Sequence, residues 1–196
     1  MKPAKVISIN ERAIENLKYI RETMERAGSF TAVPGWGGIL MGVSALLMAV
    51  LARQLPSRNL WFAGWLGEAG LALAIGSWAM MQKAKASESG LLYGPGRKFA
   101  LSLCPGMIAG LVLTVVLYRQ GLFELMPGAW LLLYGVSVVT GGAFSVKVVP
   151  IMGLSFMALG TIALFVPFEW ANWCMAAGFG VIHIAFGVVI ARRYGG

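Results

Sequence analysis

Six long apolar stretches alternate with short segments that are rich in charged residues, glycine and proline. They cover residues 33–52, 60–81, 99–118, 128–145, 148–166 and 170–191. A helix needs about 20 apolar residues to cross the roughly 30 Å hydrocarbon core of a bilayer, and the fourth and fifth stretches only just reach that length. The pattern therefore predicts an all-α fold, a polytopic membrane bundle of about six transmembrane helices.

The boundary between the fourth and fifth stretches is the weakest of the five. Gly141, Gly142 and the segment from Lys147 to Pro150 indicate a tight turn there, because glycine and proline interrupt regular helices. Two full spans joined by this turn are one interpretation. A re-entrant pair of shorter helices is the other.

The distribution of basic residues predicts an orientation. With the N-terminus placed in the cytoplasm, the outside loops contain only three of the 16 Lys and Arg residues, namely Arg53, Arg58 and Arg119. Cytoplasmic loops of membrane proteins carry an excess of Lys and Arg. We therefore expect both termini in the cytoplasm and an even number of spans in a plasma membrane, such as the bacterial inner membrane.

Composition limits the chemistry that the chain can perform. The net charge of +8 follows from the cytoplasmic basic residues, and no basic face with interleaved aromatic side chains indicates nucleic-acid binding. The chain has one histidine, two cysteines and no aspartate, so we expect no cofactor and no metal. Polar residues do not cluster near one interface as membrane enzymes of lipid metabolism require, which argues against an enzyme.

Residues 8–27 predict an amphipathic helix in a cytoplasmic segment, 1–32, that precedes the transmembrane domain, 33–196. The apolar stripe of this helix consists of Ala13, Leu17, Ile20, Met24 and Ala27. Four glutamates balance four basic residues in the helix, whereas a helix that lies on a membrane surface usually has a Lys/Arg-rich polar face. We therefore expect the stripe to pack on protein, either on the loops of its own chain or on a protein partner.

Two ionisable side chains lie within the predicted spans, Glu68 in the second and His183 in the sixth. Burial of such groups in lipid is costly, so each is a functional-site hypothesis. Counted from the outer start of each span, Glu68 lies about 12 Å deep and His183 about 20 Å deep, which makes a direct pair doubtful. For Glu68 a proton or cation site and a structural hydrogen bond are equally good interpretations, whereas for His183 the structural interpretation is favoured.

Small residues mark the faces on which membrane helices approach one another closely. The glycines that we expect on such faces are Gly38, Gly42, Gly64, Gly67, Gly70, Gly106 and Gly110. The pattern does not distinguish contacts within one chain from contacts between copies in a homo-oligomer or a larger complex.

Two functional hypotheses follow. The first is a non-enzymatic membrane protein that acts through helix contacts, as a regulator, a scaffold or a small subunit of a membrane assembly. The second is a small transporter or channel for a proton, a cation or a small solute, which uses Glu68 and His183. A water-filled cavity that reaches Glu68 with His183 on its wall favours the second hypothesis, and a closely packed Glu68 favours the first.

Overall fold

The computed structural model describes residue 14 and residues 16–20, 28, 30–86 and 94–195. This part of the chain is helical, apart from turns and an isolated β-bridge between Phe30 and Ser145. The long helices are α2 (Gly35–Ala52), α3 (Arg58–Ala86), α4 (Gly94–Arg119), α5 (Met126–Gly142) and α6 (Val148–Phe165). The final segment comprises a 3-10 turn (Phe168–Trp170), α7 (Ala171–Met175), a π-helical segment (Ala176–Ile182) and α8 (His183–Tyr194).

Each predicted span corresponds to a helical segment that is long and apolar enough to cross a membrane. Helices α3 and α4 extend beyond the apolar stretches, to Ala86 and from Gly94. Lys83 and Lys85 end the apolar pattern without ending the helix, because the backbone hydrogen bonds of a helix do not depend on side-chain polarity. The fourth and fifth stretches form two separate helices of 17 and 18 residues, and both segments are long and apolar enough to cross a membrane, as the interpretation with two full spans requires.

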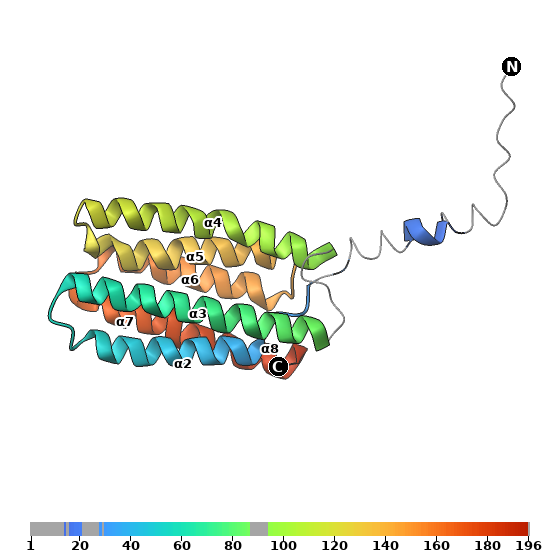
Figure 1. The fold of residues 1–196 in the computed structure, drawn as a ribbon, viewed down its shortest axis with the longest axis horizontal. Coiled ribbons are helices and arrows are strands. Elements are labelled where there is room, and N and C mark those ends of the chain that lie inside the picture. The colour runs from blue at the N-terminus through green and yellow to red at the C-terminus, as the bar shows by residue number, and fades with distance from the viewer. Residues whose placement is uncertain (1–13, 15, 21–27, 29, 87–93, 196) are drawn as a thin grey trace, which may run out of the picture.

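The long helices form two groups of three (Figure 1). In one group α5 packs against both α4 and α6. In the other, α2 packs against α3 and against the final segment, mainly its π-helical part and α8. Only 17% of the apolar window of α3 and 11% of that of α4 is buried, against 33% to 44% for the other spans. These two helices therefore present the most surface to the surroundings of the bundle.

Contacts between glycines allow close approach of helix backbones in each group. A Cβ atom added to Gly135 would lie 2.7 Å from the carbonyl oxygen of Gly153, and one added to Gly153 would lie 2.7 Å from that of Gly135. In the other group, a Cβ on Gly42 would lie 2.6 Å from the carbonyl oxygen of Gly180. Cβ atoms do not approach a backbone this closely, so the helices can touch here only because the positions are glycine.

The chain crosses the end of the bundle before it enters α2. The backbone N–H of Phe30 donates to the carbonyl of Phe144 at 2.7 Å, and the Ser145 hydroxyl donates to the carbonyl of Phe30 at 2.6 Å. The ammonium group of Lys83 donates to the carbonyl of Val33 at 3.0 Å. These bonds attach the entry to α2 to both the α5–α6 turn and the end of α3.

Aromatic side chains join the helices at the opposite end. The rings of Trp61 and Trp130 stack with their centroids 5.8 Å apart. Nε1 of Trp61 and Nε1 of Trp65 donate to the same Asn172 side-chain oxygen, at 2.6 and 3.3 Å. Each indole N–H thus has a partner although the rings are buried, as buried polar groups require. The cluster links α3, α5 and α7.

Candidate functional site

His183 and Tyr134 form a hydrogen-bonded pair in the interior of the bundle. The Tyr134 hydroxyl oxygen lies 2.7 Å from His183 Nε2. His183 is 3% exposed, and the rings of Phe156 and Phe179 lie next to its imidazole, with centroids 5.1 and 6.1 Å away. The pair therefore joins α5 to α8 within a largely aromatic environment.

The π-helical segment ends directly before His183, and the His183 ring bonds to a carbonyl of the preceding turn. The backbone N–H of His183 donates to the carbonyl of Gly180, whereas in an α-helix it would donate to the carbonyl of Phe179. His183 Nδ1 lies 3.1 Å from that Phe179 oxygen. A carbonyl can only accept, so Nδ1 carries the hydrogen, and in the neutral imidazole Nε2 accepts from the Tyr134 hydroxyl. Single-turn π-helices are frequent at functional sites.

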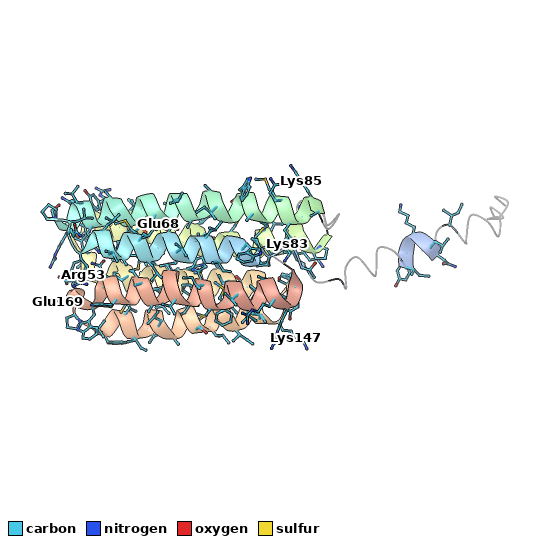
Figure 2. The ribbon with its side chains drawn as sticks, turned by 90° about the horizontal axis from the view of Figure 1, so that it is seen from below. Arg53, Glu68, Lys83, Lys85, Lys147 and Glu169 are labelled. Carbon is cyan, nitrogen blue, oxygen red and sulfur yellow. The ribbon has the colours of Figure 1, made fainter. Side chains whose placement is uncertain are left out.

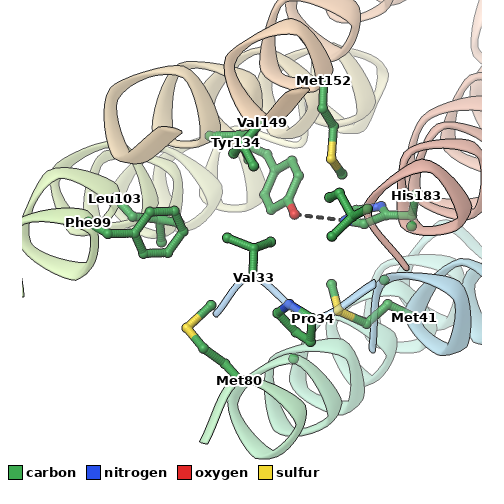
Figure 3. A pocket seen from close by; sticks show the side chains of 15 residues that line it. Val33, Pro34, Met41, Met80, Phe99, Leu103, Tyr134, Val149, Met152 and His183 are labelled. Atoms are coloured by element: carbon green, nitrogen blue, oxygen red, sulfur yellow. Dashed lines mark hydrogen bonds between the residues drawn. The ribbon is translucent and has the colours of Figure 1, made fainter. Parts of the chain in front are cut away.

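A cavity of about 120 Å³ lies beside this pair. Tyr134 and His183 contribute the only polar side chains among its described lining residues. Apolar residues or glycines from α2, α3, α4, α5, α6 and α8 form the rest of the wall, including Met41, Met80, Phe99, Val138, Met152 and Gly187. Figure 3 shows the hydrogen bond between Tyr134 and His183 next to this space, with Val33 and Met80 on the other side.

Glu68 lies apart from this cavity and contacts α2. It is 8% exposed, and its Oε1 lies 2.7 Å from the hydroxyl oxygen of Ser44. That hydroxyl also lies 2.9 Å from the carbonyl oxygen of Met41. A hydroxyl has one hydrogen, so both contacts can be full hydrogen bonds at once when the Glu68 carboxyl is protonated. Glu68 does not line the cavity that His183 lines, so the two predicted intramembrane polar residues belong to different helix contacts.

The predicted packing glycines fall into two sets. In the first set, a Cβ atom added to the glycine would overlap or touch an atom of another helix. This set comprises Gly38, Gly42, Gly64, Gly106 and Gly110. A Cβ on Gly106, for example, would overlap the Ser137 side chain. By contrast, a Cβ on Gly67 or on Gly70 would meet no atom within 4 Å. In this single chain, Gly67 and Gly70 therefore face open space.

The predicted docking stripe lies only partly within the described residues. Leu17 and Ile20 are helical, and their side chains are 66% and 52% exposed. The other three members of the stripe, Ala13, Met24 and Ala27, lie outside the described residues. Of the predicted stripe, the structure therefore describes two exposed side chains, Leu17 and Ile20.

Tyr134 is the site residue that sequence reasoning misses. Ionisable side chains within apolar stretches attract attention because their burial is costly, and a tyrosine is easily taken for one more aromatic ring. Its hydroxyl nevertheless needs a partner when it is buried. A search for every hydroxyl-bearing ring in the middle of a span would have found it.

Comparisons with protein-family models, with curated proteins and with solved structures find no match for this chain. Within the described residues, no three His, Cys, Asp or Glu side chains gather as metal ligands would. The candidate site therefore consists of two separate polar pairs and one largely apolar cavity. This arrangement can hold helices together, and at the cavity it can enclose a small molecule.

Proposed function

We propose that this chain is an integral membrane protein that acts through contacts with other proteins rather than through catalysis. The environment of Glu68 carries the proposal. A carboxyl group that conducts protons or cations must be reached by water or ions through a cavity. Glu68 is buried, lies within hydrogen-bonding distance of Ser44 and is absent from the cavity wall. Its position favours a role in joining α3 to α2.

The charges at the two ends of the bundle support insertion with both termini in the cytoplasm. Lys83, Lys85 and Lys147 lie at the end that carries the C-terminus, and Arg53 and Glu169 lie at the other end (Figure 2). An excess of Lys and Arg is typical of the cytoplasmic side. The apolar helices between these ends have the length that a bilayer requires.

The N-terminal helix is the proposed contact element. Leu17 and Ile20 are three positions apart on one helix face, and both are exposed. The acidic and basic residues of the predicted helix balance, so attraction to anionic lipid headgroups is weak. An amphipathic helix with a neutral polar face suits a hydrophobic groove on another protein.

Substitutions in the full-length chain test this contact. Leu17→Glu combined with Ile20→Glu places charges in the stripe, and Lys18→Glu changes a charge on the opposite side of the same helix. Cross-linking in cells should capture one specific protein with the wild type and with Lys18→Glu, and the double variant should lose it while keeping its melting temperature. Capture of the same protein by the double variant would contradict the proposed docking.

A small transporter or channel is the second candidate, and the position of His183 on a cavity wall supports it. Under this alternative, the protein in lipid vesicles carries a proton or cation flux that Glu68→Gln abolishes without unfolding the bundle. Under the contact proposal, vesicles with protein and empty vesicles have the same flux. A flux that depends on Glu68 would replace the contact proposal.

A further inference from the structure

The cavity beside Tyr134 has the size and the walls of a site for one small molecule. Its volume is about 120 Å³. An engineered apolar cavity of roughly 150 Å³ in a soluble protein stays dry and binds benzene. Here too the walls are apolar, apart from Tyr134 and His183. A space of this kind favours a compact, mostly apolar guest over water.

The hydrogen bonds around His183 determine which polar group such a guest can carry. The Nδ1 hydrogen is directed at the Phe179 carbonyl, and the Tyr134 hydroxyl hydrogen is directed at Nε2. Neither residue therefore has a hydrogen left to donate. The Tyr134 oxygen retains an unshared electron pair that can accept. A guest that matches the site must donate one hydrogen bond.

Three methionines make the walls adaptable. Met41, Met80 and Met152 come from α2, α3 and α6, and Figure 3 shows their side chains around the space. Methionine side chains are flexible and polarisable, and their sulfur atoms contact aromatic rings favourably. Such walls can close around a flat ring without strain in the helix backbones.

We propose that this cavity binds a small, mostly apolar molecule with one hydrogen-bond donor, of the phenol class. The ring lies among the methionines, and the hydroxyl of the guest donates to the oxygen of Tyr134. The site is in the core of the bundle, so this inference does not depend on a partner of the N-terminal helix.

Methyl NMR of the full-length protein in nanodiscs tests the proposal directly. Methionine methyl groups labelled with ¹³C are followed during titration with phenol, and separately with toluene, which has a similar size and no donor. Phenol should cause saturable shifts at the cavity methionines Met41, Met80 and Met152. Met81 and Met107 are 47% and 40% exposed on outer helix faces, so they should shift only linearly as the compound enters the lipid.

Two variants separate this site from general partitioning into lipid. Val138→Phe fills the cavity and should abolish the saturable shifts. Val112→Phe adds the same ring at an exposed position of α4 and should leave them unchanged. In the wild type, phenol should bind more tightly than anisole, in which a methyl ether replaces the donor, by about 2- to 12-fold in Kd.

Two results would overturn the proposal. One is a linear shift of all methionine methyls, and the other is saturable binding that persists in Val138→Phe. The comparison of phenol with anisole tests the hydrogen bond of the guest. Weaker binding of anisole supports a donor at Tyr134, and equal binding excludes it.

Discussion

Polar side chains in the interior of this bundle join helices in pairs. Ser44 and Glu68 link α2 to α3, and Tyr134 and His183 link α5 to α8. Among the described residues, no buried side-chain nitrogen or oxygen lacks a hydrogen-bond partner. An unpaired polar group in apolar surroundings is costly. Each pair therefore disfavours arrangements that would separate its two helices.

At this scale, Ser44→Ala should destabilise the protein more than Glu68→Gln does. The alanine leaves the Glu68 carboxyl without its partner, whereas a glutamine amide can still donate to and accept from Ser44. Hydrogen bonds between membrane helices contribute about 0.6 kcal/mol on average and up to about 1.7 kcal/mol, so the loss in Ser44→Ala should fall in that range. Reversible unfolding in mixed micelles measures it. Wild-type stability in Ser44→Ala would contradict this role of Glu68.

Glycine positions decide which helices approach most closely. The backbones of α5 and α6 touch at Gly135 and Gly153, and those of α2 and the π-helical segment touch at Gly42 and Gly180. Gly67 on α3 has no neighbour within 4 Å of an added Cβ. A glycine within a span is thus a packing position only where another helix passes over it, and the sequence around it does not reveal whether one does.

For α2 and the π-helical segment, a single added methyl group should be enough to disturb the packing. In Gly42→Ala the new Cβ would lie 2.6 Å from the Gly180 carbonyl oxygen, so the backbones must move apart at a cost of about 1–3 kcal/mol. Gly67→Ala is the matched control and should be neutral or slightly stabilising, because alanine favours helix. Melting temperatures in one detergent compare the two. Equal effects of both substitutions would argue against the close contact between α2 and the π-helical segment.

The whole molecule differs between its two ends. One end has the entry to α2 bonded across it through Phe30 and Ser145, and the C-terminus lies at this end (Figure 1). The other end is bound by the aromatic cluster around Trp61 and Asn172. The proposed membrane orientation assigns the first end to the cytoplasm and the second to the outside.

Cysteine labelling in intact cells tests that orientation. Cys104 and Cys174 are first replaced by serine, and one new cysteine is placed at Arg119, the last residue of α4, or at Arg193, in the last turn of α8; both positions are exposed. A maleimide that does not cross membranes should label Arg119→Cys in intact cells. It should label Arg193→Cys only after the membrane is opened. The reverse pattern would place both termini outside.

The order and the approximate extent of the six long helices follow from sequence, because an apolar stretch of sufficient length is a local property of the chain. The ends of α3 and α4 were predicted less well, since helices continue into polar residues such as Lys83 and Lys85. For the α5–α6 region, two full spans and a re-entrant pair of shorter helices were both open from sequence, and the lengths of the two helices fit full spans. Function and orientation remain proposals.

Tertiary structure alone decided the partners of the polar residues. Sequence spacing identified Glu68 and His183 as the notable intramembrane groups, but their pairing with Ser44 and Tyr134 depends on which helix faces meet. Those faces are set by backbone contacts between residues far apart in the chain, such as Gly42 and Gly180. The cavity has the same origin: six helices contribute to its wall, and no segment of the sequence contains it. Helix formation depends on neighbouring residues and can be predicted from a short window of sequence. Helix pairing depends on packing across the whole bundle, so no such window predicts it.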